Sequence, residues 1–333
     1  MKSPALLILL VLPLLTAFAV PSPSADVSSV PLTKVSFLPQ WIPQSQFAGF
    51  YMADKKGFYR KRGLDVTILH GGPDVDPLAN LAKEKADFVT AFLPPALASR
   101  DRGVPVVHLA QIVNRSNLMI LAWKNKGIRE LKDLDGRDIR IWDDMRVGYD
   151  TFFKAFRIDP KPCSHYYSLD MFLRRGLDAC AAMHYNEYHR IYQAGIDLEE
   201  LTVFSLHDFG CGFPEDGIYC LESTLSKSPK VCRAFTEGSM EGWEYAREHP
   251  SEALDVVMAL AWQAHMPTNR AHMQWMLEKI LASVFPSPKD TWKFGQLSPP
   301  DYTRTVEAMR SLQQLKKGVP FEQFVKSTIQ EAK

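Results

Sequence analysis

From residue 34 to residue 113, short apolar runs of strand length alternate with stretches that have helical spacing. Four runs predict strands: "KVSFL" (34–38), "LDVTIL" (64–69), "ADFVTAF" (86–92) and "VPVVHLAQIV" (104–113). The intervening stretches predict helices at 44–56, 76–85 and 94–103, the first ending at Gly57 and the last at Gly103. Strand–helix–strand alternation with short connections predicts right-handed crossovers and a parallel sheet.

A second region is predicted after the strand "LMILAW" (118–123), where a polar stretch precedes a new strand at 138–142. Alternating patterns then predict helices at 147–156, 168–175 and 185–194 and strands at 177–183, 201–206 and 217–222. From Pro229 onward the pattern is helical, with Ser228 as an N-cap and proline at the first helical position. These last helices are expected at 229–248, 250–264, 268–284 and 299–315.

This order of elements predicts an α/β fold of two lobes, in which the chain crosses from one lobe to the other and returns. The first part of lobe 1 is expected at 34–122, lobe 2 at 123–222, and the return to lobe 1 with C-terminal helices at 223–333. Crossings near 122–126 and 221–226 would form a two-strand hinge. Proteins with such a hinge close around a ligand by bending at a few linking residues.

The N-terminus has the pattern of a cleaved signal peptide at 1–19. Lys2 precedes an apolar run from Ala5 to Leu15, and Ala17-Phe18-Ala19 matches the small-x-small cleavage pattern. A membrane anchor is the alternative, but the run is shorter than the roughly 20 residues that a spanning helix needs. Residues 20–33, rich in Pro and Ser, are expected to be a flexible leader. The mature protein is therefore expected to be exported to the periplasm and soluble.

Composition excludes some classes of partner. The 333-residue chain has a formal net charge of +1, and no run of lysine or arginine occurs. Neither nucleic acid nor an anionic membrane surface is therefore an expected partner. Of the five cysteines, Cys211 and Cys220 could form a disulfide, or all could be free buried thiols. No CxxC pair occurs, and the spacing of His184 and His189 matches no zinc motif, so no metal site is expected.

Aromatic and amide side chains gather where strands are expected to end. Trp41 follows the first strand, and Phe47 and Tyr51 share a face of the helix after it. Ligands of open α/β sheets bind beyond the carboxyl ends of strands, so these residues predict a stacking wall, with a place in the core as the alternative. Phe92 and Leu93, after the third strand, are expected at the floor of the same site.

The expected second lobe has a matching set. "HYNEYH" (184–189) follows a strand and brings Tyr185, Asn186 and Glu187. Glu187 could accept paired hydrogen bonds from a ring N–H and an exocyclic amine, or could be a solvated glutamate at a helix start. Trp142 ends another strand and is expected to face the cleft, and Asp216 could accept a hydrogen bond from the ligand or cap a turn.

Three blocks of the chain resemble the NMT1/THI5-like (SsuA/THI5-like) family of periplasmic solute-binding proteins. They are "WIPQSQFAGFYMADKKGFYRKRGLDVTIL", "DACAAMHYNEYHRIYQAGI" and "FPEDGIYCLESTLSKSPKVCRAF". The resemblance implies a type II periplasmic-binding-protein fold, a thiamine-related pyrimidine as ligand, and delivery to an ABC transporter permease in the inner membrane. It also implies a monomeric carrier, without a cofactor and without catalytic residues.

Two departures narrow the function that the resemblance implies. The same superfamily includes a pyrimidine synthase with a reactive lysine and histidine, and this chain has Ala91 and Pro95 at those positions. Without the two groups, neither the Schiff base nor imidazole donation is available, so enzyme activity is not expected. Phosphate-binding relatives have a glycine-rich turn after a strand, where this chain has Asp143 and Asp144. An unphosphorylated ligand is therefore expected, with an amine or amidine as one option. A sulfonate- or nitrate-type or a sensory solute-binding protein is the other alternative.

Overall fold

The computed structural model describes residues 31–161, 167–290 and 292–328. Every element below belongs to the unit Leu32–Lys333. The expected signal peptide and most of the expected leader lie outside the described residues. Within the described ranges, no helix is long and apolar enough to cross a membrane.

The first sheet has five strands in the order β2-β1-β3-β9-β4. They are β1 (Thr33–Leu38), β2 (Leu64–Ile68), β3 (Phe88–Ala91), β4 (Val106–Val113) and β9 (Glu215–Leu221). β1 is parallel to β2 and β3, as the sequence predicts, whereas β9 is antiparallel to both of its neighbours. The expectation of a purely parallel sheet is therefore wrong, because a strand that returns from the other sheet enters between β3 and β4.

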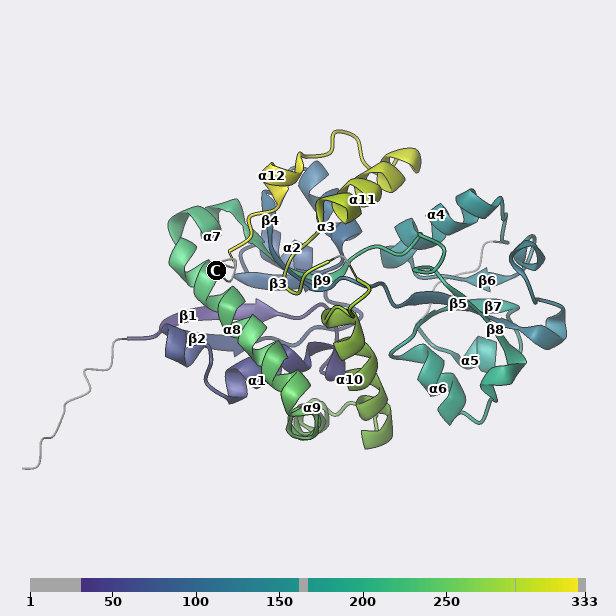
Figure 1. The fold of residues 1–333 in the computed structure, drawn as a ribbon, viewed down its shortest axis with the longest axis horizontal. Coiled ribbons are helices and arrows are strands. Elements are labelled where there is room, and N and C mark those ends of the chain that lie inside the picture. Colours follow the sequence, from purple (N-terminus) through teal and green to yellow (C-terminus); the bar gives the residue numbers. More distant parts are fainter. Residues whose placement is uncertain (1–30, 162–166, 291, 329–333) are drawn as a thin grey trace, which may run out of the picture. The chain divides into compact units, whose positions relative to one another are not determined.

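The second sheet has four strands in the order β6-β7-β5-β8. They are β5 (Leu118–Trp123), β6 (Ile139–Arg140), β7 (Ala179–Met183) and β8 (Leu201–Ser205). Its helices are α4 (Arg146–Phe156), α5 (Asp170–Leu173) and α6 (Glu187–Gln193), which Figure 1 shows beside this sheet.

The chain crosses between the two sheets at other points than the sequence predicts. The strand 118–123, expected in lobe 1, lies in the second sheet, and the strand expected at 217–222 in lobe 2 lies in the first. The crossings are therefore at 114–117 and 206–214 instead of near 122–126 and 221–226. The polar residues "NRSN" at 114–117 interrupt two apolar runs that follow each other closely, and this break marks the true crossing.

Helices cover the first sheet, and Figure 1 shows α8 and α9 beside α1. They are α1 (Ala48–Lys55), α2 (Pro77–Ala82), α3 (Leu93–Asp101), α7 (Glu222–Lys227), α8 (Pro229–Glu248), α9 (Pro250–Gln263), α10 (Arg270–Val284), α11 (Pro299–Ser311) and α12 (Phe321–Phe324). Pro229 is at the start of α8 as predicted, but the Ser228 side chain makes no capping hydrogen bond. The short helices α7 and α12 are not predicted by the sequence.

Glycines bring α1 and α8 into direct contact. A Cβ atom at Gly49 would lie 2.2 Å from the Trp243 ring, and one at Gly242 would lie 2.1 Å from the Gly49 carbonyl oxygen. Phe235 of α8 stacks on Phe88 of β3 at 4.2 Å between ring centroids. The aromatic face of α8 is therefore part of the core, and it closes one side of the first sheet.

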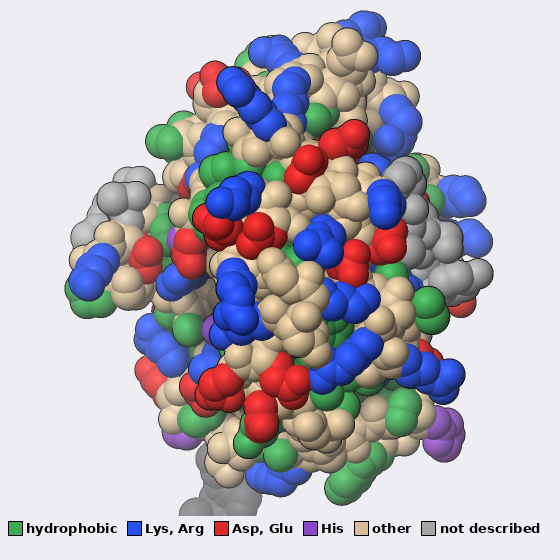
Figure 2. All heavy atoms as spheres, turned by 90° about the vertical axis from the view of Figure 1, so that its right-hand side faces the viewer, with side chains coloured by type: hydrophobic (Ala, Val, Ile, Leu, Met, Phe, Trp, Pro, Cys, Tyr) green, Lys and Arg blue, Asp and Glu red, His purple; other side chains and the backbone are tan. Residues whose placement is uncertain are grey.

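The described cysteines form no disulfide. Cys180, Cys211, Cys220 and Cys232 are free and buried, so the optional Cys211–Cys220 disulfide is not formed, and Cys163 lies outside the described residues. On the face that Figure 2 shows, Lys and Arg side chains are interspersed with Asp and Glu. Such mixed charge gives no single-sign field over this face.

Candidate functional site

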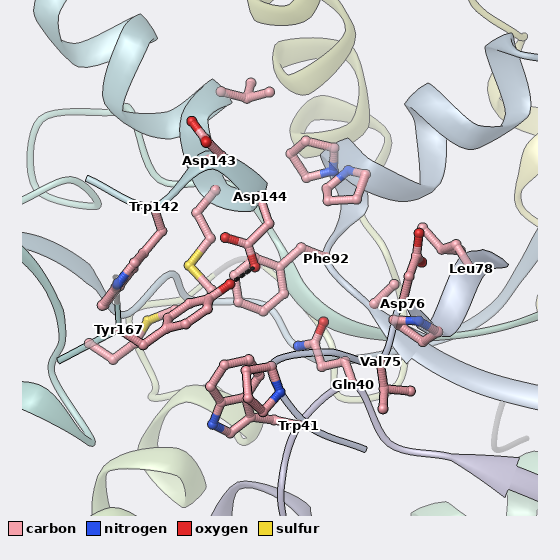
Figure 3. A pocket seen from close by; sticks show the side chains of 18 of the residues that line it. Gln40, Trp41, Val75, Asp76, Leu78, Phe92, Trp142, Asp143, Asp144 and Tyr167 are labelled. Atoms are coloured by element: carbon pink, nitrogen blue, oxygen red, sulfur yellow. Dashed lines mark hydrogen bonds between the residues drawn. The ribbon is translucent and has the colours of Figure 1, made fainter. Parts of the chain in front are cut away.

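A cavity of about 570 Å³ lies among loops that follow strands of both sheets. Its walls come from the segments after β1, β2 and β3 in the first sheet and after β6 and β7 in the second. Figure 3 shows side chains from these segments converging on one space. This is the position that ligands take in α/β sheets, beyond the carboxyl ends of the strands.

The wall from the first sheet contains amides that hold a buried carboxylate. Gln46 Nε2 donates to Asp216 Oδ2 at 2.8 Å, and Gln40 Nε2 donates to Asp216 Oδ1. Asp216 has a φ of +41°, a left-handed conformation that is uncommon outside glycine. Burial raises the pKa of Asp216 to about 8, and the nearby Glu215 carboxylate contributes to the same increase. Asp216 is therefore a fixed part of the wall, and Gln40 and Gln46 present their amides to the cavity.

Three aromatic rings meet at the cavity between the two sheets. The Trp41 and Tyr167 rings lie edge to face, 4.9 Å apart, and Tyr167 stacks with Trp142 at 6.3 Å. In Figure 3 the Tyr167 ring lies between the two tryptophans, and its hydroxyl points to Asp144. Planar faces with this spacing can stack on a flat heterocycle.

Carboxylates dominate the wall from the second sheet. Glu187, at the start of α6, accepts hydrogen bonds from Met183 N at 2.9 Å and from Asn186 Nδ2 at 2.7 Å. Asp144 accepts a hydrogen bond from the Tyr167 hydroxyl at 3.4 Å. Burial raises the pKa of both carboxyl groups. Each oxygen keeps acceptor capacity beyond these bonds, so the wall can accept hydrogen bonds from a ligand.

The balance of charge around the cavity is acidic. Five carboxylates line it among the described residues, Asp74, Asp76, Asp143, Asp144 and Glu187, against a single basic side chain, Arg102. Asp143 is paired with Arg146 at 2.9 Å, and Asp76 accepts a hydrogen bond from Ala79 N at the start of α2. A cation or a neutral hydrogen-bond donor is therefore favoured over an anion in this space.

A second buried carboxylate joins the two crossings. Glu215 Oε1 accepts hydrogen bonds from Asn117 N at 2.7 Å and from Ser116 Oγ at 2.9 Å. Burial raises the pKa of Glu215 to about 7. Because Glu215 follows one crossing and Ser116 and Asn117 belong to the other, this carboxylate fixes the two linking segments to each other.

The structure brings six of the predicted site residues to the cavity: Trp41, Phe92, Trp142, Tyr185, Asn186 and Glu187. Asp216 lies behind Gln40 and Gln46, as described above. Phe47 and Tyr51 do not line the cavity and are buried in the hydrophobic core. The face that they share on the first helix packs toward the interior, which the shared spacing alone does not reveal. Leu93 is likewise a core residue.

The groups required for the synthase chemistry are missing from this wall. Ala91 and Pro95, to which the family resemblance assigns the positions of the reactive lysine and histidine, both line the cavity. Among the described residues that line it there is no lysine, histidine or cysteine. Nor do the described parts of the chain bring together three or more side chains able to hold a metal ion.

Sequence reasoning missed Gln40 and Tyr167, and it counted Gln46 among the amides of the predicted wall without assigning it a contact. Both amides flank the predicted Trp41, and their position next to a strand end was the available signal. Tyr167 gives no such signal, because it lies in a polar segment between predicted elements and reaches Trp41 only through the arrangement of the two sheets.

The chain is similar to binding proteins and to pyrimidine synthases of known sequence. The family described as "NMT1/THI5 like" matches residues 44–253. The formylaminopyrimidine-binding protein of Halalkalibacterium halodurans is 23% identical over 71% of this chain and 73% of its own. The 4-amino-5-hydroxymethyl-2-methylpyrimidine phosphate synthase of Schizosaccharomyces pombe is 26% identical over 38% of this chain, which spans only 34% of that enzyme.

A solved structure has the same fold. The alkanesulfonate-binding protein SsuA from Xanthomonas axonopodis pv. citri, bound to MOPS, superposes with a TM-score of 0.65. It is 15% identical, and the match covers 88% of this chain and 98% of that one. This chain therefore has the two-lobe fold of periplasmic binding proteins, as predicted.

Proposed function

This chain belongs to the NMT1/THI5-like family, and from that premise we propose that it is a solute-binding protein for a small, planar, unphosphorylated ligand. A thiamine-related aminopyrimidine fits best. The ligand ring would lie against Trp41, Tyr167 and Trp142, and its amino group would donate to Glu187. The family relative that binds formylaminopyrimidine supports this ligand class.

One observation carries the proposal: aromatic rings and carboxylates share one cavity between the sheets. Stacking on an aromatic face contributes about 0.5–1.5 kcal/mol beyond the area buried. Hydrogen bonds to a charged group add about 1.5–3 kcal/mol each. An aminopyrimidine uses both, because its ring is flat and its N–H groups lie in the ring plane. A phosphate ester would bring two negative charges toward Asp143 and Asp144 and would be repelled.

The synthase alternative is weaker for a chemical reason. An imine with pyridoxal phosphate needs an amine in the cavity, and donation of an imidazole needs a histidine. Ala91 and Pro95 supply neither group. Incubation with pyridoxal phosphate should give no imine absorbance, and its appearance would favour the enzyme.

Transport is the role that follows from ligand capture by two lobes. We propose that the protein is exported to the periplasm, acts as a monomer and delivers its ligand to an ABC transporter permease in the inner membrane. Contacts from both walls would stabilise the closed form, since only differential affinity for one state can shift the balance. A sensory role would use the same capture step with a different membrane receptor.

A thermal-shift screen tests the ligand class. The protein from Val20 onward should be screened with an aminopyrimidine, its phosphate ester, an alkanesulfonate, nitrate and an amidine. A ligand present at about 100 times its Kd adds roughly 2.7 kcal/mol of stability. We expect a clear shift with the aminopyrimidine and none with the sulfonate or nitrate. A shift with the anions alone would reject the proposed ligand.

A further inference from the structure

Helices α6 and α10 meet through two hydrogen-bonded imidazoles. His189 of α6 and His272 of α10 have their Nδ1 atoms 3.0 Å apart, and their rings are stacked within 5° of parallel. α6 follows β7 of the second sheet, whereas α10 is tied to the first wall by Ser45 Oγ, which donates to Met273 O at 2.7 Å. The contact therefore joins the two sides of the cavity.

The same imidazole pair is connected to the ligand cavity. His272 Nε2 lies 3.1 Å from Asn186 Oδ1, and Asn186 Nδ2 donates to Glu187 Oε1 at 2.7 Å. Both Asn186 and Glu187 line the cavity. A continuous row of hydrogen bonds thus runs from α10, through the amide of Asn186, to the carboxylate proposed to hold the ligand.

The direction of these hydrogen bonds fixes the protonation of His272. Because the Asn186 amide nitrogen donates to Glu187, its Oδ1 is an acceptor and must receive the proton of His272 Nε2. A neutral His272 then has a bare Nδ1, which accepts a hydrogen bond from His189 Nδ1. A second proton on His272 would place two N–H groups against each other, or would force His189 to move its proton from Nδ1 to Nε2. A second proton on His189 would leave its Nδ1–H in place.

We propose that His272 is a positioning residue for the ligand site, which holds Asn186 and Glu187 in their binding geometry only while its imidazole is neutral. The inference rests on the proposed function, since Glu187 is the ligand contact proposed above. It assigns to α10 a role in binding, although no α10 side chain lines the cavity among the described residues.

The surroundings of His272 oppose its protonation. Burial, then the neighbouring His189 and Arg190, lower the pKa of His272 to about 4 from an ordinary 6.5. The other charged and titratable groups of α6, α9 and α10 are Glu187, Tyr188, His189, Arg190, Tyr192, Glu252, Asp255, Arg270, Glu278 and Lys279, and His184 precedes α6. When the hydrogen bond between His189 and His272 breaks, the pKa of His272 returns to its ordinary value. Protonation at low pH therefore favours the state in which this hydrogen bond is broken. Affinity for the ligand should therefore fall as the pH falls below about 6.5.

The test compares the pH profiles of binding for matched variants, with an aminopyrimidine as probe. In the unchanged protein, affinity should fall by up to about tenfold between pH 7.5 and pH 5.5, as a pKa change from 6.5 to about 4 allows. His272→Gln, which keeps a donor and an acceptor but cannot titrate, should bind normally at pH 7.5 and lose most of this slope. His265→Gln, an exposed control, should keep the slope. Because every variant meets the same probe, titration of the ligand itself cancels.

If affinity falls with decreasing pH to the same extent in the unchanged protein and in His272→Gln, the inference is wrong. If no aminopyrimidine binds at pH 7.5, the proposed function fails separately, and nuclear magnetic resonance of the ligand-free protein decides the inference. The His272 imidazole should then have its proton on Nε2 and stay neutral down to pH 5.5. A His272 that titrates near 6.5, or has its proton on Nδ1, would refute the inference, and the same spectra serve if His272→Gln does not fold.

Discussion

The two walls of the cavity use buried carboxylates in different ways. In the first wall, Asp216 receives hydrogen bonds from Gln40 and Gln46, which stand between it and the cavity. In the second, Glu187 lines the cavity itself and accepts from Met183 N and Asn186 Nδ2, with acceptor capacity left over. The comparison shows that Asp216 holds the amide side chains of its wall in place, whereas Glu187 is placed to accept hydrogen bonds from a ligand. Burial alone does not separate the two roles.

The largest effect should come from the second wall. Glu187→Gln replaces the proposed acceptor by a donor of the same shape, so a charge-assisted hydrogen bond worth about 1.5–3 kcal/mol is lost. We expect affinity for an aminopyrimidine to fall about 10- to 100-fold when it is measured well below the melting temperature. The melting temperature without ligand should fall as well, because Gln has one acceptor oxygen for the two donors Met183 N and Asn186 Nδ2. Titration calorimetry measures the affinity. Glu199→Gln, at an exposed glutamate of the short 3-10 helix Leu198–Glu200, serves as the control, and equal affinity in both variants would remove Glu187 from the site.

The link between the walls should matter for stability. Glu215→Gln places a donor against the Asn117 N–H and the Ser116 hydroxyl, so at least one buried group loses its partner. This costs about 1–3 kcal/mol and should lower the melting temperature by several degrees. Differential scanning calorimetry gives the answer, with exposed Glu248→Gln as control. A melting temperature equal to that of the control would mean that the two crossings are held together by other contacts.

The aromatic contribution should be smaller. Trp41→Ala removes one stacking face and the ring that touches Tyr167, so binding should weaken at least about threefold. Trp262→Ala, which removes a tryptophan that is 64% exposed, should leave affinity unchanged. Fluorescence titration compares the two variants, and an unaffected Trp41→Ala would place the ligand elsewhere in the cavity.

The smallest effect on binding should come from the first wall. Asp216→Asn keeps the size and tolerates a positive φ, so we expect affinity to change by less than about threefold. Its stability effect should depend on pH. The folded-state pKa of about 8 exceeds the ordinary 3.8, so the protonated group stabilises the fold at low pH and this contribution is lost as the pH rises from about 4 to 8.

The melting temperature of Asp216→Asn relative to the unchanged protein should therefore increase between pH 5 and pH 8. A difference that does not vary with pH would show that Asp216 stays ionised in the folded protein. A loss of affinity as large as that of Glu187→Gln would break the distinction between the two walls.

Local patterns were enough to predict most elements. Period-two and helical spacing predict β1 to β8 and the long helices α8 to α11 to within a few residues, because each buries one defined face. The sheets to which β5 and β9 belong were predicted wrongly. Membership in a sheet depends on partners that are far away in the sequence, and the local pattern of a buried strand is the same in either sheet.

The same limit applies to the site. Trp41, Trp142 and Glu187 follow strand ends, so a rule about strand ends finds them. Phe47 and Tyr51 also follow a strand, but α8 and the other helices of the first sheet enclose their helix, and both rings are core. Tyr167 and His272 come from segments without a site signal. Their roles arise only when the second sheet and the C-terminal helices lie next to the cavity.

Titration calorimetry of the unchanged protein, with an unphosphorylated aminopyrimidine and with its phosphate ester, tests the central claim most directly. The account predicts one-to-one binding of the free base, and binding of the ester that is at least about tenfold weaker, because the ester approaches Asp143 and Asp144. Tighter binding of the ester, or no binding of the free base, would contradict it.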